Sequence, residues 1–254
     1  MGTVDVSVYL DALRIGLKIS FQFPRTHVNM FAACKTLAAI AFVFCLGCVA
    51  PPCSHAQAEI TEKQLNVRLL EFSKQKDEAR ARKMVDEGAA VDSRNRAGET
   101  PLMMWVKAGN REMVAWLIEK GAKVNQEAVN HTTPLMAAAY VGDVEVMRLL
   151  LAAGAEIDRV DQVAKTAMIY ASAEGHAEAV QLLIDRGIDV NRTYEHNLTA
   201  LMWAAGYGKA QSVKLLLERG ADPSLRDDRG KTAADIAADQ GHQAVAVLLK
   251  PAAR

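Results

Sequence analysis

Residues 131–158 read HTTPLMAAAYVGDVEVMRLLLAAGAEID, and this stretch predicts two short helices. Thr133 is a candidate N-cap, and Pro134 suits the first helical turn because its missing N–H would have no partner there. Gly142 is expected to end the first helix, since glycine adopts the left-handed conformation without steric cost. The second helix, expected over Val144–Ala152, has an apolar face wider than one stripe. It must therefore be covered on more than one side.

The same pattern recurs along the chain with a period of 33 residues. One threonine column and two glycine columns keep this step, and they comprise Thr100, Thr133, Thr166, Thr199 and Thr232; Gly109, Gly142, Gly175, Gly208 and Gly241; and Gly88, Gly121, Gly154, Gly187 and Gly220. A period sustained over more than half of a chain is typical of a stacked repeat array. A pair of short helices cannot bury its own core, so neighbouring copies have to cover one another.

These units resemble ankyrin repeats. The likeness is carried by the Thr-Pro-Leu opening, the internal glycine, the Leu/Ile triplet of the second helix and Gly-Ala-Asp-Pro at 220–223. It covers about residues 62–250 and implies an all-α solenoid of helix-turn-helix units joined by β-hairpin-like turns. We expect a repeat domain over 57–254, with a cap at about 62–94 and repeats at about 95–127, 128–160, 161–193, 194–226 and 227–250.

One column departs from the family pattern. The family usually has a histidine after Thr-Pro-Leu, which hydrogen-bonds within and between repeats. Here the column holds Met103, Met136, Ile169, Met202 and Asp235. We expect apolar contact to replace those hydrogen bonds in four of the five copies, because methionine fills irregular gaps well.

The front of the chain has the layout of a secretory signal. Residues 36–50 are uncharged and mostly apolar, Lys35 precedes them, and small residues follow. The apolar run is shorter than the roughly 20 residues of a membrane span. We expect a signal peptide over 30–56 with cleavage after Ala56, or after Ala58 as second choice, which predicts a periplasmic or secreted protein. The alternative is a membrane anchor formed by residues 36–50.

Residues 1–29 are unusual for the start of a signal, because they are long and contain acidic residues. Met30 is a more ordinary beginning, so residues 1–29 are interpreted as a spurious or extended N-terminus. All four cysteines precede the expected cleavage site, namely Cys34, Cys45, Cys48 and Cys53. A cleaved chain would have no disulfide, and it would have no thiol to oxidise in an exporting compartment.

Charge and motifs exclude several classes of function. Basic and acidic residues balance at 30 each, which argues against nucleic-acid binding. No zinc-protease, serine-hydrolase, phosphate-loop or dinucleotide motif occurs. We therefore predict a protein without enzymatic activity, metal or cofactor. Acidic residues such as Asp161 and Asp227 are expected to complete turns, and His176 and His242 occupy a position where the family itself has histidine.

The resemblance implies binding through the hairpin tips and the exposed side of each first helix, along a concave face. The candidate partner-binding residues are Tyr140, Tyr170, Trp203, Tyr207, Lys107, Glu174, Asn130, His196 and Arg229. Tyr170 and Trp203 fit an inter-repeat core equally well, whereas Tyr140 and Tyr207 are expected to be exposed. We predict a monomer that binds a partner protein and has no membrane contact after cleavage. The rivals are a membrane-anchored scaffold and an immunity or accessory protein of an exported enzyme.

Overall fold

The computed structural model describes residues 53–250, with side chains from residue 61 onward. This part of the chain contains α-helices and one short 3₁₀ turn, and no β-strand. The helices are α3 (Cys53–Gln75), α4 (Glu78–Asp86), α5 (Pro101–Ala108), α6 (Arg111–Glu119), α7 (Pro134–Val141), α8 (Val144–Ala152), α9 (Ala167–Glu174), α10 (Ala177–Asp185), α11 (Ala200–Gly206), α12 (Ala210–Glu218), α13 (Ala233–Asp239) and α14 (Gln243–Leu249). The 3₁₀ turn is η2 (Glu195–Asn197).

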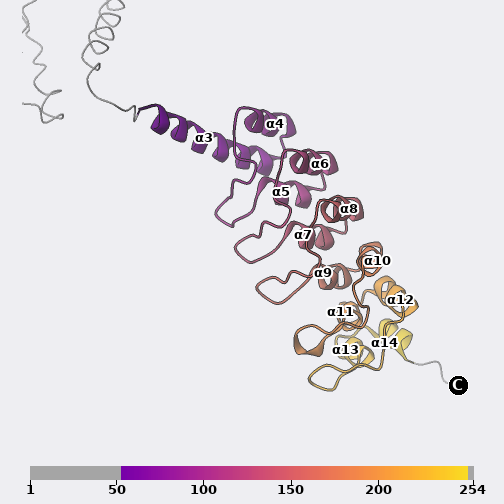
Figure 1. Cartoon of the computed structure of the whole chain (residues 1–254). Coiled ribbons are helices and arrows are strands. Elements are labelled where there is room, and N and C mark those ends of the chain that lie inside the picture. The colour runs from indigo at the N-terminus through magenta and orange to yellow at the C-terminus, as the bar shows by residue number, and fades with distance from the viewer. Residues whose placement is uncertain (1–52, 251–254) are drawn as a thin grey trace, which may run out of the picture. The chain divides into compact units, whose positions relative to one another are not determined.

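Helix pairs stack in single file along the described chain (Figure 1). The first helix of each pair, from α5 to α13, lies between the hairpin loops on one side and the second helices, from α6 to α14, on the other (Figure 1). The longer α3 packs with α4 to form the first pair. The predicted all-α repeat solenoid is therefore confirmed.

The helix boundaries follow from the capping residues predicted from the sequence. Each of the five column threonines accepts a hydrogen bond from the backbone N–H three residues later, at the start of a first helix. Gly142 is left-handed, with φ of 79°, and ends α7 as expected. The second helix occupies Val144–Ala152, the range that its apolar pattern predicts.

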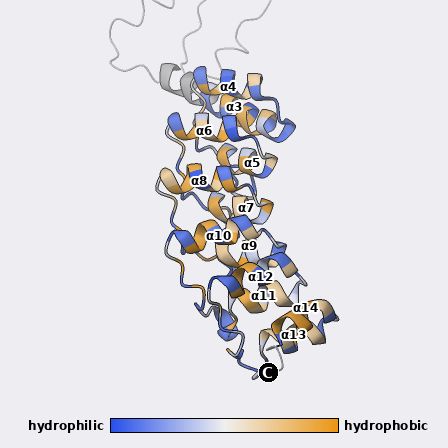
Figure 2. Ribbon diagram, turned by 90° about the vertical axis from the view of Figure 1, so that its right-hand side faces the viewer, coloured by the Kyte–Doolittle hydropathy of each residue, from blue (hydrophilic) through white to orange (hydrophobic). Residues whose placement is uncertain are grey.

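The core is distributed along the array rather than gathered in one centre. Figure 2 shows hydrophobic residues within every labelled helix. Met103, Met136, Ile169 and Met202 are all buried, so apolar contact does replace the family's histidine column. The replacement is incomplete at Met136, whose Sδ also accepts a 3.4 Å hydrogen bond from the Thr133 N–H. Asp235 instead caps α13 together with Thr232.

The two tryptophans of the first full repeat pack against the N-terminal pair. Trp105 is buried, and its Nε1 donates to the Ser73 Oγ of α3 at 3.1 Å. The guanidinium of Arg82 in α4 lies 4.8 Å from the centroid of the Trp116 ring. Both contacts tie α3 and α4 to the repeats that follow.

The second helices differ in how they begin: some have a side-chain N-cap and others do not. Asn110 and Asp143 cap α6 and α8 with their side chains. His176, at the start of α10, makes no such cap. Its ring lies over the preceding repeat, where Nε2 bonds the Tyr140 carbonyl at 3.0 Å and a Cβ added to Gly142 would meet Nδ1 at 2.4 Å. The structural role predicted for this histidine is confirmed.

The predicted signal segment lies almost wholly outside the described residues, as do residues 1–29 and the apolar run 36–50. α3 begins at Cys53 and runs through both expected cleavage positions. Between Cys53 and Lys250, no helix is both long enough and apolar enough to cross a membrane. Signal cleavage and the membrane-anchor alternative therefore stay predictions.

Candidate functional site: the hairpin face

We use the term hairpin face for the hairpin tips together with the exposed side chains of the first helices (Figure 1). Each hairpin tip is closed by a backbone hydrogen bond that spans four residues. The five donor residues are Asn95, Ala128, Asp161, Tyr194 and Asp227. One residue in each tip, at the same repeat position, has a positive φ, and the column consists of Gly98, His131, Ala164, Asn197 and Gly230. The tips thus share this backbone feature at regular intervals along the face, and the tip at 194–198 differs in that His196 also has a positive φ.

Four aromatic residues of the predicted site form two pairs on this face. Tyr140 and Tyr207 are 54% and 50% exposed, and Tyr170 and Trp203 are half-buried. The Tyr140 and Tyr170 rings meet edge to face with centroids 6.0 Å apart. The Trp203 and Tyr207 rings stack with centroids 6.1 Å apart. Tyr170 and Trp203 are therefore partly core and partly surface, which combines the two predicted alternatives.

Lys165 joins the two aromatic pairs, and the sequence analysis missed it. Its Nζ lies 5.7 Å from the Tyr170 ring centroid and 4.9 Å from that of Trp203. The lysine side chain thus bridges two successive repeats. The sequence indicates this residue only through its position in the turn just before Thr166, because a long side chain there reaches the first helices of both repeats.

Asp161 fixes the hairpin beneath this cluster. Its Oδ1 accepts hydrogen bonds from the backbone N–H groups of Val163 and Lys165, at 2.9 and 2.8 Å. Its Oδ2 accepts from the Tyr170 hydroxyl at 2.5 Å. Burial and this bond to a carboxylate both raise the pKa of Tyr170 above its ordinary value. Asp161 completes its turn as predicted, and it also orients an aromatic ring.

The charged and polar residues of the predicted site are spread along the face rather than gathered. Lys107 pairs with Glu99 at 2.5 Å in the first full repeat, and Arg229 pairs with Asp227 at 2.7 Å in the last. Glu174 is half-buried and forms no ion pair within the described chain.

The remaining two predicted residues, Asn130 and His196, are exposed at hairpin tips. Each accepts a backbone hydrogen bond from the next tip, Asn130 from Gln162 at 3.0 Å and His196 from Asp228 at 3.1 Å. The His196 Nδ1 also lies 3.5 Å from an Asp228 carboxylate oxygen. Both residues therefore link neighbouring tips as well as lying at the surface.

Exposed valines extend the apolar part of the hairpin face. Val129 and Val163 occupy neighbouring tips and are 67% and 62% exposed. The sequence places both at tips, but it carried no signal that their side chains would point outward. They lie in the same two repeats as the Tyr140–Tyr170 pair. The aromatic surface is therefore flanked by apolar tips.

A cleft of about 610 Å³ lies between α11 and α13, beside the Trp203–Tyr207 pair. Its polar lining comes from Arg229, Gln240 and His242. Gly206 leaves room there, because a Cβ at this position would lie 3.2 Å from the Ile236 Cγ2. The Trp203 Nε1 is buried and has no hydrogen-bond partner within the described chain.

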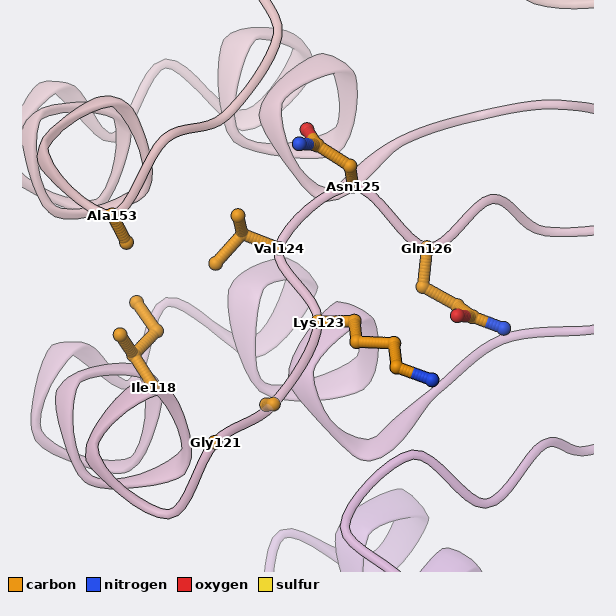
Figure 3. Close-up of a pocket in the computed structure, with 8 residues that line it drawn as sticks. Ile118, Gly121, Lys123, Val124, Asn125, Gln126 and Ala153 are labelled. Carbon is orange, nitrogen blue, oxygen red and sulfur yellow. The ribbon is translucent and has the colours of Figure 1, made fainter.

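A second depression, of about 530 Å³, lies on the other side of the molecule between the ends of α6 and α8. Figure 3 shows Ile118 and Ala153 pointing toward Val124 from two neighbouring helices, while Lys123 and Gln126 point away from it. Five of its eight lining residues are glycine or apolar, namely Ile118, Gly121, Ala122, Val124 and Ala153. This depression offers no set of converging polar side chains.

Carboxylates on the hairpin face accept hydrogen bonds from the backbone of the turns. The Asp227 Oδ1 accepts from the backbone N–H groups of Arg229 and Lys231, both at 2.9 Å. The Asp189 Oδ1 accepts from the Asn191 N–H at 2.9 Å. Within residues 61–250, no three His, Cys, Asp or Glu side chains converge on a position that could hold a metal ion. The site can offer hydrogen bonds, charge and aromatic contact to a partner.

Comparison with known families agrees with this architecture. A family model of ankyrin repeats in three copies matches residues 69–161, 126–194 and 168–254, which together span well over half of the chain. The chain belongs to the ankyrin-repeat family. Members of this family are typically interaction modules without enzymatic activity, and their repeats generally bind partner proteins. No curated protein matches the chain in a sequence search.

Proposed function

We propose that this protein is exported and binds a partner protein through its hairpin face, without catalysing a reaction. The observation that carries the proposal is the aromatic surface formed by Tyr140, Tyr170, Trp203 and Tyr207 across three successive repeats. Membership of the ankyrin-repeat family supports it.

The geometry of the aromatic residues suits recognition. Tyrosine and tryptophan are over-represented among the residues that contribute most to binding. Tyr140 and Tyr207 expose about half of their surface, yet each is held against a neighbouring ring. Rings that are already ordered lose little conformational entropy when a partner arrives. The face is therefore preorganised for contact.

Export is the second part of the proposal. It rests on the signal-like segment 30–56 and on the position of all four cysteines ahead of Ala56. We place the cleaved protein in the periplasm or outside the cell, as a monomer. The test is the N-terminal sequence of the protein from its host: a start near Gln57 in the soluble extract supports export. An uncleaved chain in the membrane fraction would favour the anchored scaffold.

Partner binding is tested by affinity capture from the envelope fraction of the native host. Tagged wild-type chain is compared with the double variant Tyr140→Ala/Tyr207→Ala, and with Val247→Ala as a control. Val247 is 67% exposed on α14, so its truncation removes apolar surface from an outer helix. We expect one stoichiometric partner that the control retains and the double variant loses, with affinity reduced by at least about tenfold.

Thermal melting of the same variants separates binding from folding. Each truncation removes one aromatic pair, which is worth about 0.5–1.5 kcal/mol. The double variant should therefore stay folded at the capture temperature. A partner that binds the double variant as tightly as the wild type would show that the hairpin face is not the binding surface.

A further inference from the structure

Lys165 has no counter-ion in the described chain, whereas Glu99 and Lys231, the two other charged residues at its repeat position, each have one. The residue 66 positions later, two repeats on, is Lys231, whose Nζ pairs with Asp239, eight residues further along the chain. Two positions earlier in the column, Glu99 pairs with Lys107, again eight residues on. In the Lys165 repeat the corresponding position is Ala173, which carries no charge. No carboxylate within the described chain lies at ion-pair distance from the Lys165 ammonium.

The ammonium is also half-buried between aromatic rings. Ring faces attract a cation, but they accept none of the three N–H hydrogen bonds in the usual geometry. The nearby carboxylate of Asp161 is already occupied by two backbone N–H groups and by the Tyr170 hydroxyl. The charge of Lys165 is thus unmatched at the centre of the aromatic surface.

A second donor in the same cluster lacks an acceptor. The Trp203 Nε1 is buried without a hydrogen-bond partner in the described chain. Both unmatched groups are donors, and one is cationic. The complementary chemistry is an acceptor with negative charge, flanked by apolar groups that contact Tyr140 and Tyr207.

We propose that the partner docks an acidic segment on this face, with an aspartate or glutamate carboxylate bound to Lys165 between the two aromatic pairs. This proposal rests on the function proposed above and names the chemistry of the partner. Glu174 lies one turn beyond Tyr170 on α9 and forms no ion pair in the described part of the chain. An acidic residue is therefore favoured at Lys165 and disfavoured at the neighbouring position.

The probe is a displayed library of random peptides, selected for binding to the full chain. Peptides recovered with the wild type should be enriched in aspartate or glutamate next to apolar residues. Their affinity should fall about tenfold for Lys165→Met, which keeps an unbranched side chain over the rings but removes the charge. Selection with Lys165→Glu should instead enrich lysine or arginine.

Lys231→Met is the matched control, because it removes a lysine from the same repeat column that already has Asp239 as its counter-ion. We expect this variant to bind the acidic peptides within about twofold of the wild type. Melting temperatures of both methionine variants confirm that the array remains folded.

Two kinds of failure are distinguishable. Selected peptides that need Tyr140 and Tyr207 but show no acidic enrichment, or that bind Lys165→Met unchanged, overturn the acidic partner and leave the docking face in place. Selected peptides that ignore Tyr140 and Tyr207, or a library that yields no binder, overturn the docking face and the inference together.

Discussion

Two successive junctions between hairpins are built differently, although the repeats have the same length. The hairpins at 121–132 and 154–165 are linked through Asn125, whose Nδ2 donates to the Gly154 carbonyl at 3.0 Å and whose Oδ1 accepts from the Glu156 N–H at 2.8 Å. A backbone hydrogen bond between their tips adds to this link.

The next junction, between the hairpins at 154–165 and 187–198, lacks these bonds within the described chain. Asp158 occupies the position of Asn125, and a carboxylate cannot donate to a carbonyl. Asp158 instead accepts from the Arg192 Nη1 at 2.6 Å, in a largely exposed ion pair. The tip that follows is the 3₁₀ turn η2, in which His196 and Asn197 both have positive φ.

The contrast shows that a strict sequence period does not give equal coupling between repeats. Segments with fewer protected hydrogen bonds open more readily in native proteins. The contact of Lys165 with the Trp203 ring crosses this less bonded junction. The surface proposed for binding therefore spans the place where we expect the array to open first.

The largest expected effect comes from breaking the better bonded junction. Asn125→Ala removes two hydrogen bonds and should lower the free energy of unfolding by about 2 kcal/mol. The matched change Asp158→Ala removes only a surface ion pair and should cost less than about 1 kcal/mol. Urea unfolding measures both, and equal losses would show that the two junctions are equally strong.

Asp158→Asn should strengthen the less bonded junction. The new amide can donate to the carbonyl of Gly187 and accept from the N–H of Asp189, which correspond by the 33-residue step to the partners of Asn125. We expect a gain of about 1 kcal/mol in the free energy of unfolding, after loss of the ion pair with Arg192. An unchanged urea midpoint would mean that the backbone there cannot adopt the linked geometry.

A smaller gain is expected from Ala164→Gly, in the tip of the hairpin at 154–165. Ala164 has φ of 55°, a conformation that glycine adopts without strain. The relief of backbone strain stabilises the folded state, and the greater entropy of glycine in the unfolded chain offsets part of this gain. The net stabilisation should be about 0.5–1 kcal/mol. The reverse change at the equivalent Gly98 should destabilise it, because a Cβ there would meet the Val129 backbone N at 2.8 Å. Thermal unfolding of the two variants should therefore move in opposite directions.

The smallest expected effect is a pH dependence in the last hairpin. Burial alone would raise the pKa of Asp227, but hydrogen bonds from the N–H groups of Lys231 and Arg229 and from the Arg229 guanidinium hold this pKa below its ordinary value. Because the folded pKa is the lower one, this stabilisation is complete above the unfolded pKa of about 4 and is lost as the pH falls through the folded pKa. Urea midpoints measured downward from neutral pH should thus fall less steeply for Asp227→Asn than for the wild type.

The sequence predicts most of the architecture because each helix end depends on a local residue type. Thr133 caps a helix with its own side chain, and Gly142 ends one through its own φ. Such effects involve only a few neighbouring residues, so a 33-residue period transfers them from copy to copy. The helix positions and the burial of the methionine column follow from this regularity.

The site was less predictable, because its chemistry depends on side chains from different repeats. The sequence pointed to Tyr140 and Tyr207 as exposed residues, and they are. It did not point to Lys165, because the reach of that side chain to Trp203 depends on how one hairpin lies against the next helix pair. The difference between the two junctions could not be predicted from the sequence either. Asn125 and Asp158 are similar in size, but only the asparagine side chain can donate a hydrogen bond.

The imidazole of His176 over Gly142 limits how the repeats of this protein can be rearranged. The preceding Gly109 has open space where its Cβ would be, because the next repeat carries Asp143 rather than a histidine. Gly142, Gly175 and Gly208 are thus constrained by a side chain of the next repeat as well as by their own backbone, whereas Gly109 is constrained by its backbone alone. All five repeats carry this glycine, and only the N-terminal pair has another residue at the position, Lys76. A repeat with the histidine would therefore fit after any other repeat but not directly after the N-terminal pair, so the modules are not fully interchangeable.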